Sequence, residues 1–316
     1  MKVVMINDCA HVGETLIEYL PKHVEAIHIK RTRGLWSKTF GIAYKILRAR
    51  GDMYHANYLL QDCYIASKLG KRPLLGHAHG SDLRSSIKNF ALGRIVKHNL
   101  KNSDKVLVST PDVLDVAKQC NEEAEYFPNP VNLELFYPKP IELCHEKLRV
   151  LIASDSNWKV KGTDIAIRAL SELSDRVEVY IINYGKDFLK TVTLAKSLGL
   201  HLNILPKTSH ENIREYYWKA DLVIDRFKLG SLGMVSLEAI ACGRPAITYV
   251  SSEYDAYKNF PLKDVNTVEG IVGVIRNTPS NLWKTEHDYL IKYHAPTMLI
   301  RRLLSTYEGL LSTTGR

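Results

Sequence analysis

The sequence has 316 residues, 45% of them hydrophobic and 24% charged, which is typical of a soluble globular chain with room for two domains. No apolar run is long enough to span a bilayer and the five cysteines form no C-x-x-C pair, so we expect a cytoplasmic protein without a transmembrane helix, disulfide framework or zinc site. The net charge of +9 indicates an anionic partner, and because no nucleic-acid-binding motif occurs, nucleic acid is not expected.

The first half of the chain alternates short apolar runs with helical patterns, which predicts a buried parallel sheet covered by helices. Gly13 stands between the first strand and the first helix. Strands are expected at 2–6, 24–29, 52–56, 72–79 and 104–109.

The stretch 30–50 carries seven Lys and Arg residues and no acid. A helix from Trp36 would place Trp36, Phe40, Ala43 and Leu47 near one face. A basic helix with an aromatic stripe suits the surface of an anionic bilayer. The alternative is a helix that covers its own sheet and has a solvated basic rim, and the sequence leaves both open.

The strand at 72–79 runs into His79-Gly80-Ser81-Asp82. Ligands of open α/β sheets bind at the carboxyl ends of the strands, where this loop would lie. Because two histidines at a strand end, His77 and His79, are costly to bury without a role, His79 is a candidate ligand-facing residue. Asp82 would either orient a ligand or cap the following helix.

The second half repeats the alternation after a polar, proline-flanked stretch at 140–148, which is typical of a linker. Lys161 lies in a strand-to-helix loop, Lys161-Gly162-Thr163-Asp164, and a long helix is expected at 295–311. Strands are expected at 148–153, 177–182, 202–205, 222–225 and 246–250.

A glycine loop follows the strand at 222–225 and leads into a helix predicted over 234–242. Gly230 and Gly233 in this loop allow backbone N–H groups to approach an anion, and the helix N-terminus adds partial positive charge. Glu238 lies early in that helix, where its carboxylate suits the hydroxyls of a ribose. The chain has no Asp-x-Asp, so a divalent cation held by that motif is not expected.

The run Glu238-Ala239-Ile240-Ala241-Cys242-Gly243-Arg244-Pro245 resembles the E-A-x-A-x-G-x-P signature of the family 4 (group 1) glycosyltransferases. His79 to Asp82 is similar to the H-G-x-D run of these enzymes, Phe127 to Pro138 to their P-N-G-V-D-x-x-x-F-x-P segment, and Lys161 to Asp164 to their K-G-x-D segment. The resemblance covers nearly the whole chain in order, and the motifs of the second half are the specific ones.

Two positions depart from the family pattern. The family has a first Glu eight residues before the second, where this chain has Gly230, which puts the contact to the donor sugar in doubt. The family's arginine before the K-G-x-D lysine has no clean counterpart either, and Lys159 is taken as its substitute.

The resemblance implies an α/β protein with the GT-B fold, two Rossmann-like domains facing across a cleft. We expect an acceptor-side domain at 1–140 and a nucleotide-sugar domain at 141–316, whose last helix, about 295–311, crosses back to the first. The implied catalytic residues are His79, Lys161 and Lys159, and Asp82 is the implied acceptor contact. The implied donor-binding residues are Gly13, Gly230, Ser231, Leu232, Gly233, Met234, Val235 and Glu238.

The implied reaction is retaining transfer of a sugar from a nucleotide diphosphate donor to a hydroxyl acceptor, with no metal and no cofactor besides the donor. A lipid-linked acceptor at the inner face of the membrane is one option, because of the basic stretch at 30–50. Two other classes stay open, a sugar-nucleotide epimerase of the same fold and a protein that binds a nucleotide sugar without turnover. The sequence favours transfer over the epimerase because no carboxylate pair occurs at a motif position.

Overall fold

A computed structural model describes residues 1–31, 40–140 and 146–314, and the chain divides into two compact units. The first unit is Met1–Pro130 with Pro296–Arg316, and the second is Val131–Ala295. The division falls at Val131 instead of near residue 140, because Val131 and Phe136 pack into the core of the second unit. The two units are described separately below.

The first unit is built on a six-stranded parallel sheet of order β2-β1-β3-β4-β5-β6. Its strands are β1 (Lys2–Ile6), β2 (Glu25–Ile29), β3 (Met53–Asn57), β4 (Leu74–Ala78), β5 (Lys105–Val108) and β6 (Glu125–Tyr126). Its helices are α1 (Val12–Glu18), α2 (Ile42–Arg48), α3 (Gln61–Lys68), α4 (Ser81–Arg84), α5 (Phe90–Asn102), α6 (Leu114–Lys118) and α14 (Pro296–Thr314), with 3-10 turns at Ser86–Lys88 and Pro111–Val113.

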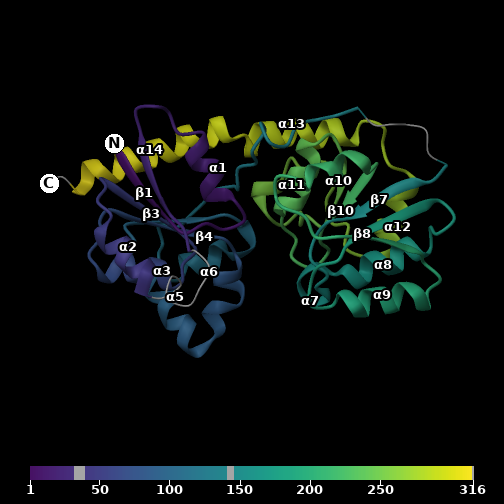
Figure 1. Ribbon diagram of the computed structural model, residues 1–316, viewed down its shortest axis with the longest axis horizontal. Helices are drawn as coiled ribbons and strands as arrows, with labels where there is room; N and C mark the ends of the chain where they lie inside the picture. The colour runs from purple at the N-terminus through teal and green to yellow at the C-terminus, as the bar shows by residue number, and fades with distance from the viewer. Residues whose placement is uncertain (32–39, 141–145, 315–316) are drawn as a thin grey trace. The chain divides into compact units, whose positions relative to one another are not determined.

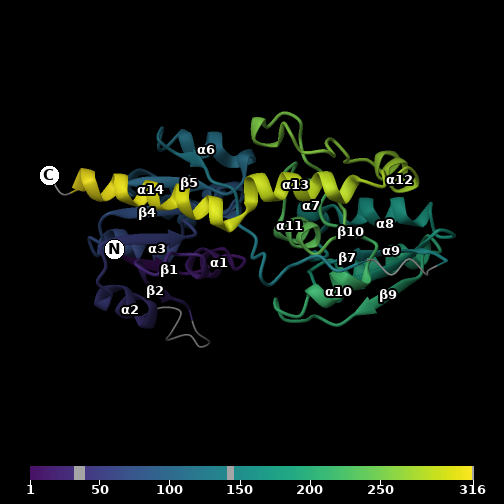
Figure 2. The same ribbon diagram turned by 90° about the horizontal axis from the view of Figure 1, so that it is seen from above.

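The two faces of this sheet carry different cores, as the period-two alternation of a strand requires. Val4, Tyr54 and Val106 face a cluster that includes residues of α2, α3, α5 and α6. The intervening residues, among them His55 and His77, point to the other face. Figures 1 and 2 show α14 lying across the strands on that second face, where its Tyr307 bonds His55.

The second unit has a five-stranded parallel sheet of order β11-β10-β7-β8-β9. Its strands are β7 (Leu148–Ile152), β8 (Val177–Ile182), β9 (Leu202–Leu205), β10 (Leu222–Ile224) and β11 (Ala246–Ile247). Its helices are α7 (Trp158–Lys161), α8 (Thr163–Ser171), α9 (Phe188–Ser197), α10 (Arg214–Lys219), α11 (Met234–Ala241), α12 (Val268–Arg276) and α13 (Leu282–His294), with a 3-10 turn at Asp255–Tyr257.

The predicted α/β class with two parallel sheets is confirmed, and the predicted strands appear within a few residues of their expected bounds. The last strand of the second unit is shorter than predicted, since β11 ends at Ile247. After it, the Tyr249 amide donates to the Arg226 carbonyl instead of continuing the ladder. In the described part of the chain, no helix combines the length and apolar character needed to cross a membrane.

Candidate functional site

The strand order of the second unit creates a switch point between β7 and β10. The chain runs from β7 through β8 to β9 on one side and then returns to place β10 on the other side of β7. Open α/β sheets bind ligands outside the carboxyl ends of the strands at such a point. Ser154 follows β7 and Asp225 follows β10, and the Ser154 hydroxyl donates to the Asp225 carbonyl at 2.9 Å, which joins the two strand ends.

Asp225 is the centre of a buried polar cluster at this switch point. Its side chain is fully buried, and its two oxygens contact Lys161 Nζ at 3.3 Å, Arg226 Nε at 3.3 Å and Ser236 Oγ at 3.0 Å. Burial alone would raise the pKa of Asp225, but the Arg226 and Lys161 cations and the hydrogen bonds outweigh it and lower the pKa to about 2. Asp225 is therefore ionised and holds two cations at the sheet edge. We call Lys161, Asp225, Arg226 and Ser236 the switch-point cluster.

The two cations of the switch-point cluster are largely withdrawn from solvent. The side chains of Lys161 and Arg226 are each 12% exposed, and Asp155 in the loop after β7 lies 4.0 Å from Lys161 Nζ. Burial lowers the pKa of Lys161 and the neighbouring Arg226 cation adds to this shift, while Asp225 opposes it. An oxyanion placed here would meet positive charge in a poorly hydrated setting, where electrostatic attraction is strong.

Arg226, which the sequence analysis did not single out, is the second cation beside Lys161. Lys159, the expected substitute for the family's arginine, is exposed on α7 and makes no hydrogen bond or ion pair with any residue that the structure describes. A signal for Arg226 was available, because it directly follows the predicted strand end at Asp225. The pairing with Lys161 was not visible in the sequence.

The glycine loop packs directly against the switch-point cluster. A Cβ atom at Gly233 would overlap the Arg226 guanidinium and the Asp225 carboxylate, so only glycine lets the loop backbone approach the cluster. Gly230 has φ of +60°, and a Cβ there would lie 3.0 Å from Ser251 Cβ and 3.1 Å from Tyr249 Cε1. A Glu in this backbone conformation would be strained and would start tightly against Ser251 and Tyr249.

The other loop residues differ in what they can offer a ligand. Ser231 is fully buried, and its hydroxyl has no hydrogen-bond partner among the described residues. The Leu232 amide donates to the Tyr257 hydroxyl at 3.1 Å, so this amide is already used within the protein. Met234 and Val235 begin α11 and are half-buried. Of the predicted loop contacts, Ser231 is therefore the residue whose side chain could gain a hydrogen bond from a ligand.

Glu238 is buried in α11, and the protein itself orients its carboxylate. One oxygen bonds His210 Nε2 at 2.9 Å, and the other accepts from the Tyr217 hydroxyl at 2.9 Å. Burial raises the pKa of Tyr217 well above its usual value and the adjacent Glu238 carboxylate adds to this shift, so Tyr217 stays a donor. A carboxylate offers about four acceptor sites in all, so Glu238 retains capacity for further hydroxyl donors.

In the first unit, Asp82 plays a different part from the acceptor contact expected. It is fully buried, and its two oxygens accept from four backbone amides, those of Leu59, His79, Gly80 and Leu83. These bonds order the turn after β4 and leave the carboxylate facing no solvent. Asp82 therefore has a structural role, which it plays from inside the first turn of α4, where the N-cap residue is Gly80.

His79 lies half-buried at the carboxyl end of β4, on the loop that Asp82 orders. Its Nδ1 bonds Ser109 Oγ at 3.0 Å and its Nε2 bonds Asn57 Oδ1 at 3.2 Å. Burial lowers the pKa of His79 to about 3, so the ring is neutral at pH 7.

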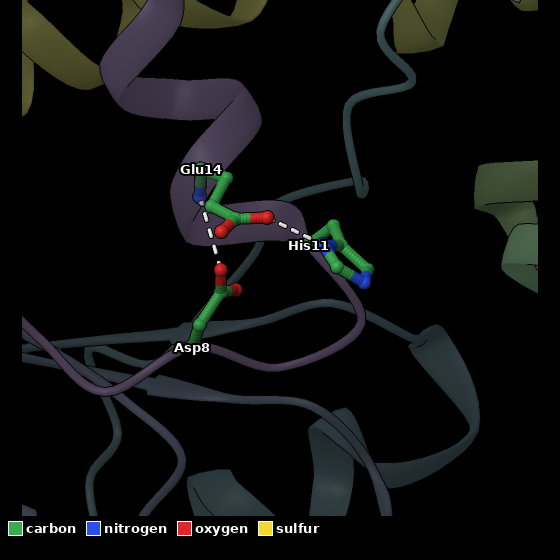
Figure 3. Close-up of side chains that lie close together, drawn as sticks. All are labelled: Asp8, His11 and Glu14. Atoms are coloured by element: carbon green, nitrogen blue, oxygen red, sulfur yellow. Dashed lines mark hydrogen bonds and ion pairs between the residues drawn. The ribbon is translucent and has the colours of Figure 1, made fainter. Parts of the chain in front are cut away.

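Gly13 lies in the first turn of α1, where the Asp8 carboxylate already occupies the place that a bound phosphate would take. Its amide donates to Asp8 Oδ1 at 3.0 Å, and the Glu14 amide donates to Asp8 Oδ2 at 3.3 Å (Figure 3). A Cβ at Gly13 would lie 2.9 Å from Asn57 Nδ2. Gly13 therefore serves close packing around Asp8 and is a poor contact for a donor phosphate.

Asp8, His11 and Glu14 also bring potential metal-ligand atoms within 4.8 Å of one another. Figure 3 shows that each side chain has a partner inside this group, with Asp8 capping α1 and His11 bonded to Glu14. Lys30 forms an ion pair with Glu14 and would repel a cation. The capping and ion pairs account for this arrangement without a metal.

Comparisons with known proteins agree with this architecture. Residues 139–256 match the family described as "Glycosyl transferases group 1". The chain is 21% identical over 212 residues to N-acetyl-alpha-D-glucosaminyl L-malate synthase of Bacillus anthracis, covering 62% of this chain and 56% of that protein. It is 24% identical over 237 residues to an uncharacterized glycosyltransferase of Methanocaldococcus jannaschii, covering 70% of this chain and 63% of that protein. Both alignments span less than two thirds of the relative.

Solved structures resemble the whole chain. A sucrose-phosphate synthase from Thermosynechococcus elongatus aligns with a TM-score of 0.71 at 15% identity, over 99% of this chain and 100% of that one. Anabaena HepE in complex with UDP and glucose aligns with a TM-score of 0.73 at 15% identity, over 98% of this chain and 100% of that one. At such identities the likeness shows the fold, which is GT-B. Residues 139–256 of the second unit thus resemble the group 1 glycosyltransferases, and the chain as a whole has the GT-B fold.

Proposed function

We propose that the protein transfers a sugar from a nucleotide diphosphate donor to a hydroxyl acceptor, and that the switch-point cluster holds the diphosphate of the donor. The observation that carries this proposal is the pair of buried cations, Lys161 and Arg226, at the carboxyl ends of β7 and β10. Structures similar in fold are described as complexes with UDP and with UDP-glucose, which makes UDP-sugars the first donors to test.

The chemistry needs charge stabilisation more than a dedicated base. As the bond from the sugar carbon to the diphosphate oxygen breaks, negative charge grows on the leaving diphosphate, and positive groups placed in advance lower the barrier. Lys161 and Arg226 supply those charges. We propose retention of configuration and no metal, with the leaving phosphate taking the acceptor proton as the new glycosidic bond forms. Glu238, oriented by His210 and Tyr217, would accept the ribose hydroxyls.

Binding without turnover is the alternative, because Gly230 replaces the Glu that contacts the donor sugar in the family. A thermal-shift screen of UDP-, GDP- and ADP-sugars tests donor binding separately from sugar transfer. A ligand at a hundred times its Kd raises the free energy of unfolding by about 2.7 kcal/mol. A stabilising donor supports the site. If no nucleotide sugar stabilises the protein at millimolar concentration, both the transferase and the binding proposal fail.

We also propose that the first unit attaches to an anionic membrane, which would give access to a lipid-linked acceptor. The described part of the basic stretch supports this. Ile42 and Ile46 of α2 are buried against the sheet, whereas Phe40, Tyr44 and Leu47 are 69%, 62% and 54% exposed. The apolar stripe predicted from Phe40 to Leu47 is therefore on the surface; Trp36 and Lys38 lie outside the described residues.

Charge around this stripe favours an anionic partner. Between residues 26 and 103 the sequence has fifteen Lys and Arg but only three Asp. Lys45 and Arg48 are exposed on α2, and Tyr44 and Leu47 line a groove of about 610 Å³ between α2 and α3. A surface that joins exposed aromatic residues to cations matches the interfacial region of a bilayer with anionic lipids.

Charge reversal on α2 is expected to release the protein from vesicles. The variant Lys45→Glu/Arg48→Glu should lose about 2 kcal/mol of affinity for anionic vesicles, roughly thirtyfold, because each cation near such a surface contributes about 1 kcal/mol. Co-sedimentation with vesicles of phosphatidylcholine alone and with added phosphatidylglycerol measures this. Lys186→Glu/Lys196→Glu, in the second unit, makes the same change in net charge and should bind like the unmodified protein. Equal binding of both variants, or no preference for anionic lipid, would refute membrane attachment through α2.

A further inference from the structure

A continuous chain of hydrogen bonds crosses the face of the first sheet that α14 covers. It connects Tyr307 of α14 to the ligand-facing end of β4 through three histidines, and every heavy-atom distance in it is 3.2 Å or less. In order, the pairs are Tyr307 Oη–His55 Nδ1 at 2.6 Å, His55 Nε2–His77 Nδ1 at 3.2 Å, His77 Nε2–Ser109 Oγ at 3.0 Å, Ser109 Oγ–His79 Nδ1 at 3.0 Å and His79 Nε2–Asn57 Oδ1 at 3.2 Å.

All three histidines of this chain are neutral at pH 7. His55 and His77 are fully buried, and burial lowers the pKa of His55 to about 3 and that of His77 well below its usual value. His79 has the same shift from the same cause. A neutral imidazole carries one ring proton, so each histidine donates at one nitrogen and accepts at the other. The direction of one bond therefore fixes the direction of the next.

Tyr307 sets the direction of hydrogen-bond donation at its own end of the chain of side chains. Its hydroxyl is fully buried, and His55 is its hydrogen-bond partner among the described residues. The phenol must donate to His55 Nδ1, because otherwise its proton would be buried without an acceptor. His55 then carries its proton on Nε2 and donates to His77. By the same rule His77 donates from Nε2 to Ser109, whose hydroxyl has one proton and can still donate it to His79 Nδ1.

The other end gives the same direction independently. The amide nitrogen of Asn57 donates to Met5 Sδ at 2.9 Å, so the Asn57 oxygen faces His79 and can only accept. The two ends thus agree that His79 holds its proton on Nε2.

We propose that Tyr307 is a positioning residue, which through this chain fixes His55 and His77 as Nε2–H tautomers, while Asn57 at the other end holds His79 as the Nε2–H tautomer. Its Nδ1 is engaged by Ser109, so His79 cannot act as a general base in the transfer. These tautomers do not rest on the proposed function, because they follow from groups inside the first unit.

The test is nitrogen-15 NMR of the histidine rings in the full chain, which reports which ring nitrogen carries the proton. In the unmodified protein without ligand, His55, His77 and His79 should all show protonated Nε2 and unprotonated Nδ1. A proton on Nδ1 of His79 would overturn the proposal, and this reading needs no variant to fold and no nucleotide to bind.

Two variants and a matched control then test which groups set the tautomers. Tyr307→Phe removes only the hydroxyl, and His55 and His77 should shift to mixed tautomers while the backbone spectrum is retained. Tyr54→Phe is the matched control, because Tyr54 is also buried in this unit but its hydroxyl bonds the backbone of Ala49 and Gly51. Ser109→Ala should disturb His79 and leave His55 unchanged. Unchanged histidine tautomers in Tyr307→Phe would show that Tyr307 does not set the direction.

Discussion

Replacing Asp225 by asparagine is expected to destabilise the protein by about 3–5 kcal/mol at pH 7, the usual cost of breaking a buried ion pair. The substitution keeps the shape of the side chain but removes the charge that lies 3.3 Å from both Lys161 Nζ and Arg226 Nε. Two poorly hydrated cations would then face each other without compensation. Urea unfolding measures the loss, and Asp175→Asn, at an exposed carboxylate of the same unit, should change the free energy of unfolding little.

This destabilisation should depend on pH in a defined direction. The folded protein lowers the pKa of Asp225 from 3.8 to about 2, so its carboxylate contributes stability that is fully present above pH 3.8 and is lost as the pH falls toward 2. The difference between the unmodified protein and Asp225→Asn should therefore be smaller at pH 3 than at pH 7. A difference that is absent at pH 7, or that grows in acid, would contradict the role given to Asp225.

The second large effect is expected at Arg226. Arg226→Ala should weaken binding of UDP by about 1.5–3 kcal/mol, roughly ten- to a hundredfold, because a hydrogen bond to a charged group is worth that much. Uridine, which lacks the diphosphate, should lose far less. The fold should persist, since Asp225 keeps Lys161 and Ser236 as partners.

Calorimetric titration with UDP and uridine measures this difference, and Lys159→Ala is the matched control. Lys159 lies on α7, two residues before Lys161, but it is exposed and outside the switch-point cluster. Salt should weaken UDP binding in the unmodified protein more than in Arg226→Ala. Equal losses for UDP in the Lys159 and Arg226 variants would mean that the diphosphate binds elsewhere.

The architecture was predictable from the sequence, because it depends on local patterns. Strand and helix periodicity gave the two parallel sheets, and the signature from Glu238 to Pro245 indicated the family. Lys161 could be singled out because it lies beside Gly162 in a strand-to-helix loop. Its proposed contact with phosphate stays a prediction.

The partners of these residues could not be predicted, because they come from distant parts of the chain. Lys161 meets Asp225 across 64 positions, and His55 meets Tyr307 across 252. The two roles open to Asp82 could be separated only once four amides were seen around its carboxylate. The loss of the family's Glu at Gly230 likewise became intelligible only from the positive φ at that position.

Release of nucleoside diphosphate from a nucleotide sugar tests the central claim most directly. The donor is the one that stabilises the protein best in the thermal-shift screen, and the assay contains EDTA and a panel of hydroxyl acceptors that includes lipid-linked ones. We expect release by the unmodified protein and by Lys159→Ala, and a loss of at least tenfold in Lys161→Ala. If release is the same in Lys161→Ala, or requires a divalent cation, the proposed stabilisation of the leaving diphosphate by the switch-point cluster is contradicted.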